Sequence, residues 1–234
     1  MALGFESGDR TLSILKGFNL TSRVALTIRH SEREKGDSEH TWVGDLEKTR
    51  PLTTRGRDLA RRFGSLLPPF MNLYVSSTPV PRAMDTAALI VEGFREAHTD
   101  SNINELRIDS TLSPARHHAR DMESYNHLRQ VTPGALFIRK WLDGEIDSTL
   151  LASPPMAIGS YVRTLTNRVS ALPASSLHIG VSHDYDLIVM REVLFGGKFE
   201  QLPWIEYLDG LFFEWPKSEV VRVRWRTHEV ELHL

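Results

Sequence analysis

The sequence predicts an α/β fold, a three-layer sandwich with a mostly parallel central sheet flanked by helices. Two observations support this prediction: three strand-like apolar runs, and helix-like segments between and after them. The runs cover residues 24–28, 72–77 and 177–183, and each leads into a polar tip. Strands that alternate with helices are typical of parallel sheets, because each helix carries the chain back to the start of the next strand.

The helical segments have apolar residues at the spacing of one helix face. Residues 53–67 place Leu59, Ala60 and Phe63 together, with Thr53 or Thr54 as the expected N-cap. Residues 186–195 are apolar on nearly every side, which predicts a helix buried between layers. Two further segments complete the set, 82–97 and 156–172.

The end of the chain, residues 210–234, predicts short strands rather than helices. Residues 220–225 and 228–234 alternate between apolar and polar side chains, and 210–215 form an apolar run. We expect them to extend the sheet antiparallel at one edge. Residues 101–153 are poor in strand signal and rich in His, Arg and Asp, so we interpret them as a partly helical cap inserted into one domain that spans residues 1–234.

Composition excludes several classes of protein. The net charge of -2 over 234 residues gives no basic surface for nucleic acid. No apolar run approaches the roughly 18 residues of a membrane span. The absence of cysteine excludes disulfides and thiolate metal sites. The N-terminus has early acids and no apolar core, unlike a signal peptide, so we expect a cytoplasmic protein.

The polar tips of the three strands carry a chemically coherent set of side chains. In open parallel sheets, ligands bind outside the carboxyl ends of the strands, where these tips are expected to meet. Arginine forks match the oxygens of phosphate, and histidine can attack phosphorus as a nucleophile. A nearby acid can protonate the leaving alkoxide. The set comprises Arg29, His30, Arg33, Arg82, His183 and Asp184.

Four segments in this order resemble the motifs of the histidine phosphatase superfamily, which has a phosphoglycerate-mutase-like fold. "RHSER" at 29–33 resembles its Arg-His-Gly motif, with Ser31 in place of glycine. "PLTTRG" at 51–56 is similar to its Leu-Thr-x-x-Gly segment. "SSTPVPRAMDTA" at 76–87 resembles its Ser-Ser-Pro-x-x-Arg-Ala motif, with Thr78 inserted. "VSHD" at 181–184 resembles its second histidine motif.

The resemblance implies roles for these residues. His30 is the expected nucleophile, and Arg29, Arg33, Arg82 and His183 form the expected phosphate pocket. Ser31 either narrows this pocket or donates its hydroxyl to the phosphate. The proton donor has two interpretations. The acid-phosphatase branch implies Asp184, which we favour, whereas the mutase branch implies an acid in the segment after the Arg82 helix. The acids of that segment are Glu105, Asp109, Asp121 and Glu123.

The sequence thus predicts a phosphatase that hydrolyses a phosphomonoester through a phosphohistidine on His30, without a metal or a cofactor. The expected partner is a small phosphorylated substrate or a phosphoprotein. A phosphomutase and a non-catalytic phosphate-binding scaffold are the alternatives. His30 alone would also fit a buried structural histidine. The pair His117-His118 invites a metal site, but adjacent residues point apart and have no partner at ligand spacing, so we favour a polar cap segment.

Overall fold

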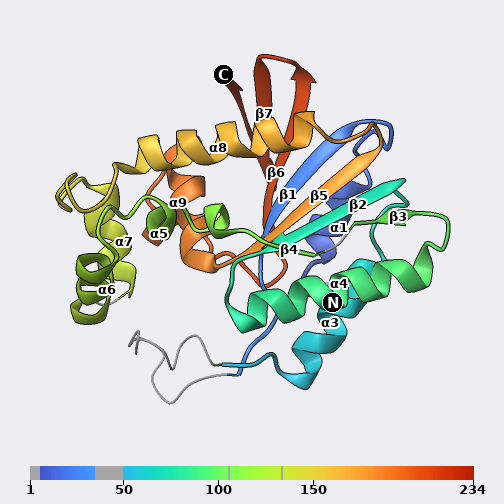
Figure 1. Cartoon of the computed structure of the whole chain (residues 1–234), viewed down its shortest axis with the longest axis horizontal. Coiled ribbons are helices and arrows are strands. Elements are labelled where there is room, and N and C mark those ends of the chain that lie inside the picture. The colour runs from blue at the N-terminus through green and yellow to red at the C-terminus, as the bar shows by residue number, and fades with distance from the viewer. Residues whose placement is uncertain (1–5, 35–49, 105, 133) are drawn as a thin grey trace.

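The structure is a computed structural model, and it describes residues 6–34, 50–104, 106–132 and 134–234. Three parallel strands form the centre of its sheet, in the order β2, β5, β1. These strands are Arg23–Arg29 (β1), Asn72–Ser77 (β2) and Ser176–Ser182 (β5). The three predicted strands are therefore confirmed as neighbours, and their carboxyl ends lie at one edge (Figure 1).

The sheet continues on both sides of this parallel centre. Beyond β1 it becomes antiparallel through three strands, as the alternating pattern at the end of the sequence predicts. These are Gly210–Lys217 (β6), Val220–Trp225 (β7) and His228–His233 (β8). On the other side, β2 pairs in parallel with two strands that the sequence analysis missed, Asn102–Ile103 (β3) and Arg107–Ile108 (β4). Strands of two residues are too short to show an alternating pattern.

Helices cover both faces of the sheet, so the predicted three-layer sandwich is confirmed (Figure 1). One face packs against Asp9–Leu15 (α1), Thr54–Ser65 (α3) and Pro81–Ala97 (α4). The other face packs against Pro154–Ser170 (α8) and Asp184–Phe195 (α9). The helix α9 buries Leu187, Ile188, Val189 and Met190, in agreement with its apolar sequence.

Two local features position α3 and α4. Thr53 is the N-cap of α3, and its hydroxyl accepts from the backbone N–H of Gly56 at 2.8 Å. Glycines let the two helices approach closely, because an added Cβ would lie 2.1 Å from the Ile90 carbonyl oxygen at Gly64 and 1.9 Å from that of Arg61 at Gly93. These close contacts lie in the C-terminal halves of both helices and hold the two helices against each other.

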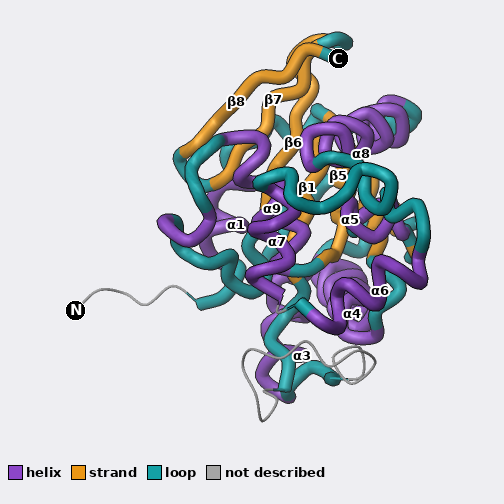
Figure 2. Tube along the Cα trace, turned by 90° about the vertical axis from the view of Figure 1, so that its left-hand side faces the viewer, coloured by secondary structure: helices purple, strands orange, loops and turns teal. Residues whose placement is uncertain are grey.

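The segment proposed as a cap begins with β3 and β4 and continues through short helices. Within it, α7 (Gly134–Leu142) packs against α9. Its other elements are Ser110–Leu112 (η1), Pro114–His117 (α5) and Met122–Val131 (α6). The helices α5, α6 and α7 gather beside α9 (Figures 1 and 2). No helix among the described residues is both long and apolar enough to cross a bilayer.

Candidate active site

The polar tips meet because the parallel hydrogen bonding continues past the strand ends. The N–H of His30 donates to the carbonyl of Ser182 at 2.9 Å, one residue beyond β1. The N–H of Thr78 donates to the carbonyl of Val181 at 3.1 Å, one residue beyond β2. These two bonds bring the residues after β1 and β2 against the end of β5, where His183 follows.

Arg82 joins the two histidines. It lies in the first turn of α4 and is 7% exposed. Its Nε donates to His30 Nε2 at 3.0 Å, and its terminal nitrogen lies 3.5 Å from His183 Nδ1. The two imidazole rings are 5.4 Å apart between centroids. The structure therefore brings His30, Arg82 and His183 together, as the sequence predicts.

Hydrogen bonds fix the protonation of both rings. The Nδ1 of His30 lies 2.7 Å from the carbonyl of Ser31, so it carries the proton and leaves a lone pair on Nε2. The Nε2 of His183 lies 2.9 Å from the hydroxyl of Thr78, and its Nδ1 faces an arginine donor. His183 therefore carries its proton on Nε2. Burial holds the pKa of both imidazoles well below the usual value, and the charge of Arg82 lowers both further.

Arg29 and Asp184 form an ion pair beside the histidines, with 2.9 Å between the guanidinium nitrogen and Oδ2. Trp204 donates its indole N–H to the same carboxylate oxygen at 3.2 Å. Burial raises the pKa of Asp184, but the attraction of Arg29 and the bond from Trp204 outweigh it and hold the pKa below its usual value. Arg29 also donates to the carbonyl of Ile205 at 2.8 Å.

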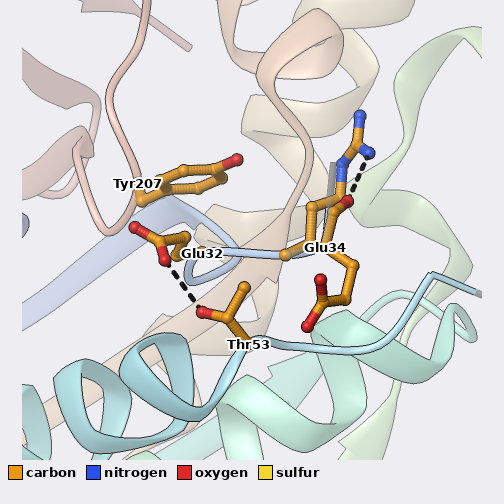
Figure 3. A pocket seen from close by; sticks show the side chains of 5 residues that line it. Glu32, Glu34, Thr53 and Tyr207 are labelled. Atoms are coloured by element: carbon orange, nitrogen blue, oxygen red, sulfur yellow. Dashed lines mark hydrogen bonds between the residues drawn. The ribbon is translucent and has the colours of Figure 1, made fainter. Parts of the chain in front are cut away.

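A hollow of about 400 Å³ opens next to this group (Figure 3). Tyr207 links the two, because its ring covers the Arg29 guanidinium at 4.0 Å and lies 5.9 Å from the ring of His30. In Figure 3 the carboxylate of Glu32 lies between Tyr207 and Thr53, whose hydroxyl donates to it at 2.8 Å. The lining is completed by Arg33 and Glu34.

Arg33 and Ser31 occupy different positions around His30. Arg33 lies close enough to His183 for its charge to lower the pKa of that imidazole. Ser31 is fully buried, and its hydroxyl donates to the carbonyl of Gly56 at 2.7 Å. The Ser31 proton is thus engaged by the start of α3. An added Cβ at Gly56 would lie 2.0 Å from the Glu32 carbonyl oxygen, so only glycine allows this approach.

The acids of the mutase-type interpretation lie in other surroundings. Asp109 is buried, forms an ion pair with Arg168 of α8, and accepts from Thr111. Asp121 is the N-cap of α6 and accepts from the backbone N–H of Glu123. The side chain of Glu123 is exposed. Glu105 lies outside the described residues. Among the described candidates, Asp184 is therefore the acid that contacts a predicted phosphate-binding residue.

Sequence reasoning missed three residues of this group. Thr78 was visible as an insertion in a motif, but its bond to His183 depends on how β2 lies beside β5. Trp204 and Tyr207 belong to the loop before β6, and no pattern in the sequence marks that loop as part of the site. Trp204 is 41% exposed, so this tryptophan is not a core residue.

The group is chemically suited to a tetrahedral oxyanion. It combines neutral imidazoles, fixed guanidinium groups and one carboxylate. No cluster of three or more metal-binding side chains occurs within the described ranges. The arrangement can hold phosphate oxygens with arginine while presenting the lone pair of His30 Nε2.

Comparisons with known proteins give the fold. No family model and no curated protein matches the chain. A mycobacterial glucosyl-3-phosphoglycerate phosphatase, solved with inorganic phosphate, is similar at 16% identity and a TM-score of 0.54, over 88% of this chain and 98% of its own. A phosphoglycerate mutase from Bacillus anthracis is similar at 12% identity and a TM-score of 0.50, over 92% and 94%. A mycobacterial hydrolase reaches 17% and 0.54, over 88% and 91%.

The chain thus has an α/β fold that is shared by phosphatases and mutases. More particularly, the fold is the one found in phosphoglycerate mutase, which is the fold that the resemblance in the four sequence motifs implies. At these identities the similarity describes the fold, and the chemistry of this chain has to be argued from its own residues.

Proposed function

We propose that the protein hydrolyses phosphate monoesters through a phosphohistidine intermediate on His30. The observation that supports this most is the Arg82 guanidinium between two neutral imidazoles, one of which keeps a lone pair on Nε2. A neutral imidazole is the nucleophilic form, and burial together with the neighbouring positive charges keeps the pKa of His30 low. The substrate of this proposal is a small phosphorylated molecule or a phosphoprotein.

The phosphate of the substrate would draw the Arg82 N–H away from His30. Phosphate oxygens are stronger acceptors than a neutral imidazole, so the guanidinium turns to them and frees the lone pair. Arg29 supplies a second donor. Within the described part of the chain, nothing accepts from its buried Nε. Arg33 completes the positive surroundings, which stabilise charge on the equatorial oxygens during transfer.

The reaction proceeds in two steps. In the first, His30 Nε2 forms a bond to phosphorus while the bond to the ester oxygen breaks, and Asp184 gives its proton to the leaving alkoxide. In the second, water attacks the phosphohistidine, the bond between phosphorus and Nε2 breaks, and Asp184 takes a proton from the water. The Nδ1 proton stays with the Ser31 carbonyl in both steps. Histidine and acid are restored, and inorganic phosphate leaves.

Asp184 carries its proton mainly in acidic solution, because its ion pair with Arg29 holds its pKa low. Hydrolysis of alkyl phosphates should therefore be fastest at acidic pH. The variant Asp184→Asn should lose more activity on an alkyl phosphate than on p-nitrophenyl phosphate, whose leaving group departs without a proton. Equal losses on both substrates would remove Asp184 as the donor.

Replacement of His30 tests the proposal itself. His30→Ala should abolish hydrolysis of p-nitrophenyl phosphate, because it removes the Nε2 lone pair that is proposed to form the intermediate. The control His233→Ala changes an exposed histidine in β8 and should keep full activity. Hydrolysis that persists in a folded His30→Ala protein would disprove the phosphohistidine mechanism.

A non-catalytic phosphate-binding role is the second candidate. It is favoured by the bond that Arg82 makes to the attacking lone pair of His30. This role predicts that the protein binds phosphate or phosphopeptide without hydrolysing any ester, and that no phosphohistidine forms.

A phosphomutase would form the phosphohistidine but transfer its phosphoryl group to a sugar or glycerate acceptor in preference to water. Comparing the rate of transfer to such an acceptor with the rate of transfer to water therefore separates a mutase from a phosphatase.

A further inference from the structure

Asp186 is a carboxyl group that the phosphatase proposal does not use. It lies in the first turn of α9, and its Oδ1 accepts from the hydroxyl of Ser113 at 2.9 Å. Its Oδ2 lies 2.8 Å from the hydroxyl of Ser182. Ser182 ends β5 and directly precedes His183, whereas Ser113 lies between η1 and α5. The carboxyl group therefore connects the strand that carries His183 to the segment that follows β4.

Counting protons shows which form of the carboxyl group fits this geometry. The hydroxyl oxygen of Ser182 also lies 2.6 Å from the carbonyl oxygen of Leu112. Two oxygens at that distance need a proton between them, and a carbonyl has none to give. The single proton of Ser182 therefore goes to Leu112. The contact at 2.8 Å then needs a proton from Asp186 Oδ2, so the geometry matches the neutral carboxylic acid.

The surroundings of Asp186 contain opposing influences. Burial is the largest, and the ionised carboxylate of Asp184 adds to it; together they raise the pKa of Asp186 to about 7. Hydrogen bonds that the Ser182 and Ser113 hydroxyls can donate to the ionised form act in the opposite direction, as does the charge of Arg129 of α6. The N-terminal turn of α9 also favours the ionised form. Two buried tyrosines also face the group, Tyr125 from α6 and Tyr161 from α8, and their raised pKa values keep both uncharged near neutral pH.

We propose that Asp186 is a positioning residue that works in its protonated form, donating to Ser182 and accepting from Ser113 to hold the end of β5, and with it His183, in place. The effect on catalysis rests on the phosphatase function proposed above. When Asp186 loses its proton, the Ser182 hydroxyl has one proton for two acceptors, the Leu112 carbonyl and the Asp186 carboxylate, so one of these hydrogen bonds is lost. A second negative charge then also appears two residues from Asp184. Both changes displace Ser182 and the imidazole that follows it.

The variant Asp186→Asn provides the test, because an amide has the hydrogen-bonding pattern of the acid without its titration. Its N–H₂ donates to Ser182, and its oxygen accepts from Ser113. We expect activity similar to wild type at about pH 6. Above about pH 7, kcat/KM of the variant relative to wild type should rise by roughly tenfold for each pH unit, as the wild type loses the proton. Asp186→Ala, which removes both bonds, should be impaired at every pH.

The ratio cancels the titration of the substrate and of Asp184, which are common to both proteins. The matched control is Asp147→Asn, an exposed acid in the loop between α7 and α8. Its activity ratio to wild type should stay constant with pH. A constant ratio for Asp186→Asn as well would overturn the positioning role.

Two measurements without substrate separate this inference from the phosphatase proposal. The unfolding midpoint of Asp186→Asn, relative to wild type, should rise from about pH 4, where the unfolded chain loses the proton, to about pH 7, where the folded wild type loses it, and should stay level above that. Carbon NMR of labelled aspartate in the wild type should show a buried carboxyl group that titrates near neutral pH and disappears in the variant. A carboxyl group at position 186 that titrates in the ordinary acidic range would overturn the proposal, even if the Asn variant failed to fold.

Discussion

Replacing Thr78 by valine isolates one hydrogen bond in the candidate site. Thr78 is 1% exposed, and its hydroxyl accepts the Nε2 proton of His183 at 2.9 Å. Valine keeps the branched shape and removes the acceptor. The imidazole then has two options. It can keep a buried N–H without a partner, or it can move the proton to Nδ1, where that proton would face the donor of Arg82.

The size of the effect follows from these two options. A buried donor that loses its partner costs about 1–3 kcal/mol. Moving the proton to Nδ1 places two donors opposite each other, so the ring or Arg82 has to turn away. If this cost falls on the state that transfers phosphate, kcat/KM drops by about 10- to 100-fold. Thr78→Ser keeps a hydroxyl and should stay close to wild type.

The assay is kcat/KM for p-nitrophenyl phosphate, measured alongside histidine ring NMR that reports which nitrogen carries the proton. We expect wild type and Thr78→Ser to show the proton of His183 on Nε2. The valine variant should show a shifted or exchanging signal together with lower activity. A folded Thr78→Val protein with wild-type kcat/KM would refute the reasoning, because His183 would then not need this acceptor.

Two further predictions concern charge and pH. Arg82→Lys keeps the positive charge but loses the planar fork that contacts both histidines, so kcat/KM should fall by roughly 100-fold, or about 3 kcal/mol, with little change in the unfolding midpoint; a loss below about threefold would contradict the bridging role. Burial lowers the pKa of His178 to about 4. Between that value and about 6.5 the unfolded chain binds the extra proton, so stability should be lost as the pH falls through this window, by up to about 3 kcal/mol. Urea unfolding should show a smaller acid loss for His178→Gln, and an equal loss in both proteins would assign the effect to other groups.

The parts of the fold that sequence reasoning predicted are those with a local signal. The apolar runs that became β1, β2 and β5 end in polar residues, and the parallel-sheet rule places these ends together. His30, Arg82 and His183 could therefore be grouped although they are distant along the chain. The N-cap at Thr53 has a comparable local signature, because a short hydroxyl side chain precedes a helix pattern.

The parts that it missed depend on contacts between distant segments. The ion pair between Arg29 and Asp184 joins two residues that were both assigned to the phosphate reaction, and only the structure shows that they hold each other. Tyr207 reaches Arg29 because the loop before β6 folds back over the sheet edge. The surroundings of Asp186 depend on Ser113, which is 73 positions away along the chain, so its sequence neighbours gave no sign of a raised pKa.

Detection of the covalent intermediate tests the central claim most directly. The protein is mixed with a radiolabelled phosphate monoester, quenched in alkali, where phosphohistidine survives, and digested to locate the label. We predict label on the peptide that contains His30, lost on acid treatment, removed by further turnover in water and missing from His30→Ala. Sustained hydrolysis with no label on that peptide would contradict a phosphohistidine at His30.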